Sequence, residues 1–217
     1  RYERQASKRN AERDFDVSFF PEGGYLVEGV PCTLGFKALK PDGNSTFVSC
    51  RIVDAEGRET AAAESLHAGM GKVSFTPQHA GIYYAECTNP QGVTKRFRLP
   101  AARRDVCVLQ IFPASERFSV QVAVPRGYDP GPLALLVHCR GELCYYKDWG
   151  ASKEHLTFMR NDFPDGVLQF LLLDRENRPL SERLLFCYDE DRQPQVTATQ
   201  DKPRYGRREK VSLTLDF

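Results

Sequence analysis

The sequence of 217 residues contains no hydrophobic run long enough to cross a membrane. Its longest apolar run is Leu133–Val137, the length of a β-strand, whereas a membrane-spanning helix needs about 18 apolar residues. An excess of either charge is also missing, because 30 Lys and Arg stand against 29 Asp and Glu, a formal net charge of +1. This balance argues against a dedicated nucleic-acid-binding protein, which needs a basic face to displace counterions from phosphates.

Motifs that carry metal, phosphate or covalent chemistry are missing too. The histidines and cysteines show no His-x-x-x-His or Cys-x-x-Cys spacing, which zinc sites commonly use. Gly23 and Gly24 lack the pattern of a phosphate-binding loop and precede a predicted strand rather than a helix. His138 and Cys139 are neighbours on a predicted strand, so their side chains point to opposite faces and cannot act as one nucleophilic pair. We therefore expect no catalytic residue, no cofactor, no metal ion and no enzyme activity in this chain.

One acidic run leaves a minor metal hypothesis open. Asp189, Glu190 and Asp191 lie at a predicted domain junction, where a calcium ion could stiffen an array of sandwiches. Calcium needs several oxygen ligands that converge. Three consecutive acids more often form a solvated linker, which is the interpretation we prefer.

Turn residues divide the chain into short alternating segments. The 16 glycines and 14 prolines favour many turns over long helices. From Phe15 onward, hydrophobic and polar residues alternate in short runs, which is typical of half-buried strands. Such spacing is typical of β-sandwiches with about seven strands. The predicted fold class is all-β, with tandem seven-stranded sandwiches of the fibronectin-III or immunoglobulin-like kind. The predicted strands cover residues 15–19, 33–39, 47–53, 72–75, 82–87, 93–99, 106–111, 118–124, 133–138, 143–146, 156–158, 167–173 and 183–188.

Composition predicts four segments. Residues 1–14 form a polar linker from an upstream segment, residues 15–100 a first sandwich and residues 101–190 a second. Residues 191–217 form a linker and the truncated start of a third domain. Residues 61–65 have some helix propensity, but the segment is short and lies between strands.

The sequence at the start of the third unit is similar to the sequence at the start of the first. Tyr205 and Thr214–Phe217 repeat, apart from one insertion, the spacing of Tyr25 and Thr33–Phe36. The chain stops within an alternating run, so we expect it to be a fragment of a longer protein. We also expect residues 195–217 to be at least partly ordered.

The seven cysteines are odd in number and widely spaced, which is not a disulfide framework. Cys139 and Cys144 could face each other across a hairpin with Gly141 at the first central position of a type II′ turn. Cys32 and Cys87 could bridge facing strands, by analogy with the disulfide between the sheets of immunoglobulin domains. The alternative for both pairs is reduced thiols packed as small hydrophobic groups.

Three aromatic residues form a candidate ligand site. Tyr145, Tyr146 and Trp149 lie close together in the sequence, and if exposed they could stack on sugar rings. The alternative is that Trp149 caps one end of the second core, as large aromatic side chains often do.

A family resemblance is visible when the first unit is quoted in full. It reads DFDVSFFPEGGYLVEGVPCTLGFKALKPDG, then HAGMGKVSFTPQHAGIYYAEC, then RFRLP. These runs resemble the macroglobulin-like domains of the alpha-2-macroglobulin superfamily, and look most similar to those of large exported proteins of Bacteroides-type bacteria. The later runs LLVHCRGELCYY, LQFLLLD and TQDKPRYGRREKVSLTL look like successive domains of such proteins. In that group the array often precedes a region similar to the plug domain of TonB-dependent receptors.

The resemblance implies a role more than a reaction. It implies export to the periplasm or outer membrane, and a non-catalytic array that acts as a structural spacer and protein-interaction module. One alternative is a recognition module for a polysaccharide or protein ligand at the cell envelope. Another is a segment of a protease-trapping macroglobulin, although the Cys-x-Glu-Gln thioester motif of such traps does not occur here.

Overall fold

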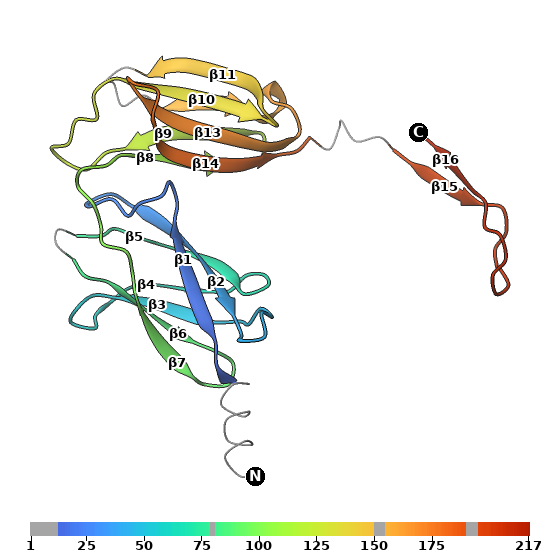
Figure 1. Cartoon of the computed structure of the whole chain (residues 1–217), viewed down its shortest axis with the longest axis horizontal. Coiled ribbons are helices and arrows are strands. Elements are labelled where there is room, and N and C mark those ends of the chain that lie inside the picture. The colour runs from blue at the N-terminus through green and yellow to red at the C-terminus, as the bar shows by residue number, and fades with distance from the viewer. Residues whose placement is uncertain (1–12, 79–80, 150–154, 190–194) are drawn as a thin grey trace, which may run out of the picture.

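The computed structural model describes residues 13–78, 81–149, 155–189 and 195–217. These residues form two β-sandwiches and a separate two-stranded hairpin (Figure 1). All strand pairs within the sheets are antiparallel. The prediction of an all-β chain with tandem seven-stranded sandwiches is confirmed.

The first sandwich packs a three-stranded sheet, in the order β1-β2-β5, against a four-stranded sheet, in the order β4-β3-β6-β7. Its strands are β1 (Asp16–Pro21), β2 (Cys32–Leu39), β3 (Ser49–Val53), β4 (Glu59–Glu64), β5 (Met70–Phe75), β6 (Tyr84–Thr88) and β7 (Thr94–Arg98).

The second sandwich pairs the sheets β12-β9-β8 and β11-β10-β13-β14. Its strands are β8 (Val108–Pro113), β9 (Arg117–Ala123), β10 (Leu133–Cys139), β11 (Glu142–Trp149), β12 (Leu156–Met159), β13 (Gly166–Asp174) and β14 (Pro179–Cys187). A short 3₁₀ turn, Arg160–Asp162, follows β12. Numbered within each sandwich, the first, second and fifth strands form one sheet and the others form the second sheet. The two sandwiches therefore share one topology.

Alternation of residue types builds each core. In β2, Cys32, Leu34, Phe36 and Ala38 point inward and are almost fully buried, because successive side chains of a strand face opposite sides. The core of the second sandwich is richer in aromatic rings. Phe118 lies at its centre, with ring centroids 5.4 to 5.6 Å from those of Phe158, Phe163 and Phe170.

One strand differs from the sequence expectation. Residues 61–65, with their helix propensity, belong mostly to β4, an edge strand that pairs with β3 through Ala61, Ala62 and Ala63. The ladder to β3 and the packing of Ala61 and Ala63 against the core override the weak preference of alanine for helix.

The proposed Cys139–Cys144 disulfide is not formed, and the turn type predicted for it is wrong. Arg140 and Gly141 both have positive φ, 52° and 86°, so they are the two central residues of the turn and Cys139 pairs with Glu142. A register shift then leaves Cys144 without a cross-strand partner in the ladder, and both thiols are free.

The proposed Cys32–Cys87 bridge is not formed either. The two residues lie on different sheets, as expected, but both thiols are free. The Cys32 Sγ accepts from the Val27 amide at 3.2 Å and donates to the Val30 carbonyl at 3.3 Å. On β6, Cys87 lies directly opposite Cys50 of β3 instead.

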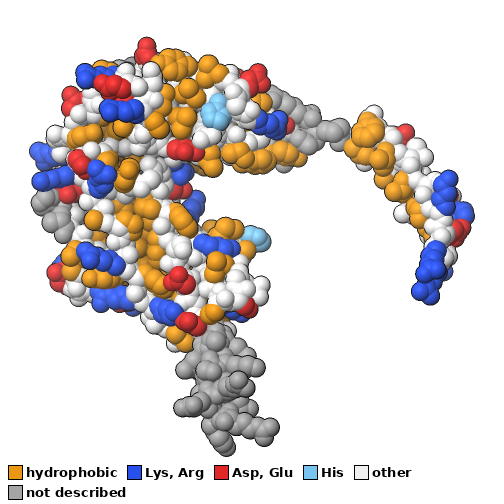
Figure 2. Space-filling model, viewed as in Figure 1, with side chains coloured by type: hydrophobic (Ala, Val, Ile, Leu, Met, Phe, Trp, Pro, Cys, Tyr) orange, Lys and Arg blue, Asp and Glu red, His pale blue; other side chains and the backbone are white. Residues whose placement is uncertain are grey.

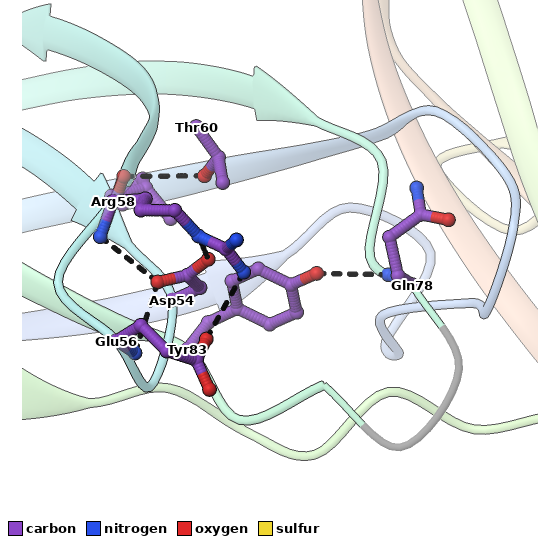
Figure 3. Close-up of polar contacts among 7 residues, drawn as sticks. Asp54, Glu56, Arg58, Thr60, Gln78 and Tyr83 are labelled. Atoms are coloured by element: carbon purple, nitrogen blue, oxygen red, sulfur yellow. Dashed lines mark hydrogen bonds and ion pairs between the residues drawn. The ribbon is translucent and has the colours of Figure 1, made fainter.

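Two hairpin turns use the same network of polar contacts. In the β3–β4 turn (Figure 3), one Asp54 carboxylate oxygen accepts the amides of Glu56 and Arg58 at 3.0 and 2.9 Å. The other oxygen accepts the Arg58 guanidinium at 2.7 Å. Gly57 adopts the positive φ, 81°, that this turn requires.

The β13–β14 turn repeats this arrangement with Asp174, Glu176 and Arg178. One Asp174 carboxylate oxygen accepts the amides of Glu176 and Arg178, both at 2.9 Å, and the other accepts the Arg178 guanidinium at 2.8 Å. Asn177 has the positive φ, 60°, that Gly57 has in the first turn. The amide of Arg178, together with its guanidinium, holds the pKa of the Asp174 carboxyl below its usual range. The pattern Asp-x-Glu-Gly/Asn-Arg is thus a turn motif that the chain uses twice.

This motif predicts a pH dependence of stability. Because the pKa of Asp174 is lower in the folded state, its contribution is present above the unfolded pKa of about 3.9. That contribution is lost as the pH falls through the folded value. We expect the free energy of unfolding of the wild type to exceed that of Asp174→Asn by more at pH 6 than at pH 3. Urea unfolding at both pH values measures this, and an equal difference at both would contradict it.

The hairpin pairs β15 (Thr197–Gln200) with β16 (Leu213–Asp216). Residues 195–217 are therefore ordered in part, and Figure 1 shows the hairpin apart from both sandwiches. One of its faces is apolar and exposed, and consists of Val196, Ala198, Leu213, Leu215 and Phe217.

Candidate functional site at the junction between the sandwiches

A network of polar contacts lies where the two sandwiches meet. The connection between β1 and β2, residues 22–31, packs against β8 and β14 of the second sandwich. The buried Ser181 hydroxyl of β14 donates to the Gly23 carbonyl at 2.8 Å and accepts the Leu109 amide at 3.0 Å. One side chain thus connects the first sandwich with two strands of the second.

Gly23 permits this close contact. Its φ is +82°, and a Cβ atom there would lie 2.8 Å from the Cβ of Val108 and 3.0 Å from the Leu109 carbonyl oxygen. A side chain at this position would therefore collide with the second sandwich and strain the backbone. Gly24 has a φ of +99° but open space around it, so only the first of the two glycines is required by the contact.

An ion pair and a hydrogen bond flank this contact. The Arg183 guanidinium on β14 lies 3.0 Å from the Glu22 carboxylate, and 17% of the Arg183 side chain is exposed. The Gln110 amide donates to the Pro31 carbonyl at 2.7 Å, and itself accepts from Gln121 at 2.7 Å. Polar contacts therefore reach from both ends of the β1–β2 connection to the second sandwich.

The segment between β7 and β8 is also tied to the first sandwich. The Arg103 amide donates to the Leu26 carbonyl at 2.8 Å, and the Arg103 carbonyl accepts the Glu28 amide at 2.9 Å. The Arg103 guanidinium lies 4.9 Å from the centre of the Tyr25 ring. The same guanidinium holds the pKa of the Asp105 carboxyl below its usual range through a hydrogen bond. Hydrogen bonds therefore fix the segment between β7 and β8 to the first sandwich, so it is not a free linker.

The hydrophobic cores meet at the same place. Val108 at the start of β8 and Ala123 at the end of β9 are buried in the core of the first sandwich, although their strands belong to the second. Because apolar and polar contacts both cross the junction, relative motion of the sandwiches requires breaking packed structure.

A groove of about 610 Å³ opens beside the junction, with walls from both sandwiches. It mixes hydrophobic side chains with a few polar ones. Its polar members are Glu22, Thr33, Lys72, Ser74, Gln110, Gln121, His155 and Arg183. In the part of the chain that the structure describes, no three His, Cys, Asp or Glu side chains converge as metal ligands.

The predicted aromatic site is not assembled. Trp149 is buried, with 1% of its surface exposed, and belongs to the core of the second sandwich. Tyr145 points inward and packs edge-on against Phe158 with centroids 4.9 Å apart. Only Tyr146 is exposed. Its hydroxyl donates to Asp148 at 3.0 Å, and that bond raises the pKa of the phenol. Alternation along β11 separates the rings, so the prediction of a stacking platform for sugars is wrong.

Six of the seven cysteines are buried. Burial raises the pKa of Cys107 to about 11 and also raises the pKa of Cys32. At neutral pH a thiol with a raised pKa is mostly protonated and is a poor nucleophile. Cys144 is the most exposed of the seven, and its pKa is raised as well, chiefly by partial burial.

The remaining candidates have different positions. His138 and Cys139 point to opposite faces of β10, as predicted, and the His138 Nδ1 is buried without a hydrogen-bond partner. Of the acids considered for calcium, Asp189 is described, and Glu190 and Asp191 lie outside the described residues. Within the described ranges, no helix is long and apolar enough to cross a membrane.

The junction could not be predicted from the sequence. Gly23 and Gly24 lack the pattern of a phosphate-binding loop, and nothing in the sequence shows what approaches Gly23. Ser181 has no sequence signal at all, since a single serine in a strand is ordinary. The paired glycines after Glu22 are the one signal that could have pointed to a close contact.

Comparisons with known proteins do not place the chain in a family. No family model and no curated protein matches it. Solved structures similar to it include the BSP domain of a biofilm-associated protein, with a TM-score of 0.34 and 14% identity over 82% of this chain and 30% of that one. Red sea bream transglutaminase has a TM-score of 0.28 and 12% identity over 87% of this chain and 34% of that one. The native conformation of E. coli alpha-2-macroglobulin has a TM-score of 0.30 and 12% identity over 93% of this chain and 16% of that one.

The chain spans about a third or less of the length of each of these three proteins. At such identities and TM-scores the matches carry no argument about activity, ligands or partners.

Proposed function

We propose that these sandwiches are a non-catalytic array of a larger exported cell-envelope protein, which acts as a structural spacer and protein-interaction module. The observation that carries the spacer role is the junction. Ser181, Gly23 and Leu109, the Glu22–Arg183 ion pair and the shared core residues hold the sandwiches together at many points. Export, to the periplasm or outer membrane, and membership of a larger protein rest on the sequence resemblance.

The topology supports a role in spacing. Both sandwiches have the same strand order, and the connectors after their last strands, residues 99–107 and 188–196, are equal in length. Repeated units that contact their neighbours through fixed junctions build extended arrays. A spacer of this kind needs no active site, and we propose none in these residues.

The interaction role has its own support in an exposed sheet face. On the outer side of the sheet β11-β10-β13-β14, large apolar side chains are about half exposed or more: Leu143, Tyr146, Val167, Leu184 and Phe186. Figure 2 shows hydrophobic side chains gathered along the lower rim of the upper sandwich, at the position of β14. Exposed apolar patches of this kind are typical of protein interfaces.

A polysaccharide ligand is the weaker alternative, because the one tryptophan is buried and Tyr145 faces the core. A segment of a protease trap also remains an alternative. Its reactive motif would have to lie outside these residues, since Cys-x-Glu-Gln does not occur among them.

A binding experiment tests the interaction role. The immobilised chain is offered an envelope extract and, in parallel, a glycan array. We expect a saturable protein partner that is lost when Leu184 and Phe186 are both changed to serine. The matched control is Phe20→Ser, which changes a side chain of similar exposure, 58% against 57% and 62%, on the first sandwich.

The two arms separate the candidates. Saturable glycan binding would contradict the protein-interaction role and favour the polysaccharide alternative. No saturable partner in either arm would remove the interaction role and leave the spacer alone.

A further inference from the structure

We propose that Cys50 and Cys87 form a disulfide bond when this chain folds in the presence of a disulfide oxidant. The two residues are direct partners in the antiparallel ladder between β3 and β6. Both side chains point into the first core, and their residues are 1% and 0% exposed. The pair is therefore held face to face by the sheet itself.

Sheet geometry brings the pair within bonding range. Residues directly opposite each other in an antiparallel pair have Cα atoms about 4.5 to 5.5 Å apart. Disulfides span Cα separations of about 4.4 to 6.8 Å. A bond between these two cysteines therefore fits the spacing of the paired strands.

The other cysteines are placed less favourably. Cys32 lies in the opposite sheet and is engaged by the backbone of residues 27 and 30. Cys139 lies opposite Glu142, and the register shift leaves Cys144 without a cross-strand partner in the ladder. Among the described strands, Cys50 and Cys87 are the one pair of cysteines that the ladders place directly opposite each other.

The surroundings of the pair indicate when the bond would form. Both sulfur atoms lie in the closed core of the folded sandwich, since their residues are 1% and 0% exposed. A disulfide oxidant must reach a sulfur atom to react with it, so buried thiols react slowly. Oxidation therefore belongs to the folding stage, before the core closes over both sulfur atoms.

The chemistry needs a disulfide donor such as oxidised glutathione. One cysteine thiolate attacks the donor disulfide, which forms a mixed disulfide and releases one glutathione thiol. The second cysteine then attacks the mixed disulfide, so that the Cys50–Cys87 bond forms and a second glutathione leaves. Two protein thiols lose two protons and two electrons, and the donor disulfide is reduced to two thiols.

In the cell this bond requires an oxidising compartment, so to that extent the inference rests on the proposed export. The test does not depend on it. The full chain is unfolded and reduced, then refolded with a mixture of reduced and oxidised glutathione. Free thiols are blocked with iodoacetamide in denaturant, and intact mass and peptide mapping follow. Failure of the bond to form in this test would leave the spacer role untouched.

We expect two fewer blocked thiols than in the fully reduced chain, with the peptides of Cys50 and Cys87 linked. We also expect the oxidised form to melt roughly 10 °C higher, because the bond restricts the unfolded chain. The variant Cys32→Ala should still form the bond, and Cys87→Ala should not.

The controls keep the result interpretable. Circular dichroism shows whether each variant has refolded. If Cys87→Ala fails to fold, Cys32→Ala still tests the proposal, because this variant keeps both Cys50 and Cys87. A full set of free thiols in the refolded wild type would overturn the proposal, as would a bond that joins any other pair.

Discussion

Replacement of Gly23 by alanine is expected to loosen the junction between the two sandwiches. The new Cβ would lie 2.8 Å from the Val108 Cβ and 3.0 Å from the Leu109 carbonyl. The positive φ costs an alanine roughly 1–2 kcal/mol, and overpacking typically adds about 1–3 kcal/mol. We expect calorimetry to show one coupled unfolding transition for the wild type and two separate transitions for Gly23→Ala.

The matched control is Gly24→Ala. Its φ is also positive, but nothing lies within 4 Å of the added Cβ. This variant therefore has the backbone cost without the collision, and the two transitions should stay coupled. If both variants gave the same calorimetric trace, the contact of Gly23 with the second sandwich would not be what couples the units.

Replacement of Phe118 by alanine is expected to destabilise the second sandwich by about 3–5 kcal/mol, the usual range for a phenylalanine removed from a core. Phe118 is 1% exposed and contacts three other phenylalanine rings, so the cavity is lined by rigid groups that cannot easily collapse into it. Trp149, the only tryptophan, is buried in the same core. Its fluorescence therefore reports the urea unfolding of this sandwich directly.

Leu143→Ala is the control for this prediction. Leu143 lies in the same sandwich but is 60% exposed, and exposed substitutions usually change stability by less than about 0.5 kcal/mol. If Phe118→Ala lowered the free energy of unfolding by less than about 1 kcal/mol, its effect would be close to that of an exposed substitution. The ring cluster would then not be a tightly packed core.

The strands could be predicted because period-two alternation is a local signal. Runs such as Phe118–Val124 place alternate side chains inward and outward whatever the rest of the chain does. β4 is a strand of the first sandwich that the sequence does not predict, because alanines and charged residues fill an edge position there. Its identity depends on pairing with β3, which is a property of the fold and not of the segment.

The junction and the cysteine partners could not be predicted for the same reason. Ser181 meets Gly23 across 158 residues of sequence, and no local pattern encodes that contact. The register of a hairpin depends on which residues form its turn. Arg140 and Gly141 form it here instead of Gly141 and Glu142, which is why Cys139 faces Glu142 rather than Cys144. The analogy with immunoglobulin domains predicts that Cys87 lies in the sheet facing Cys32, and it does. Only the ladder shows that its nearest opposite cysteine is Cys50.

Trp149 shows how alternation limits a prediction made from residue types alone. Tyr145, Tyr146 and Trp149 are close in sequence, yet the strand places Tyr145 and Trp149 on the core side and Tyr146 outside. The exposed apolar face of the same sheet then becomes the better candidate for recognition. Its exposed apolar residues come from β11, β13 and β14, so no single segment of sequence reveals it.

The most direct test of the spacer role is the relative orientation of the two sandwiches in solution. Residual dipolar couplings of backbone amides, measured for both units of the full chain in one partially aligned sample, report this orientation. We predict that a single alignment tensor fits both sandwiches in the arrangement of Figure 1. Two tensors of clearly different magnitude would show that the units move independently, and would contradict the account of a fixed junction.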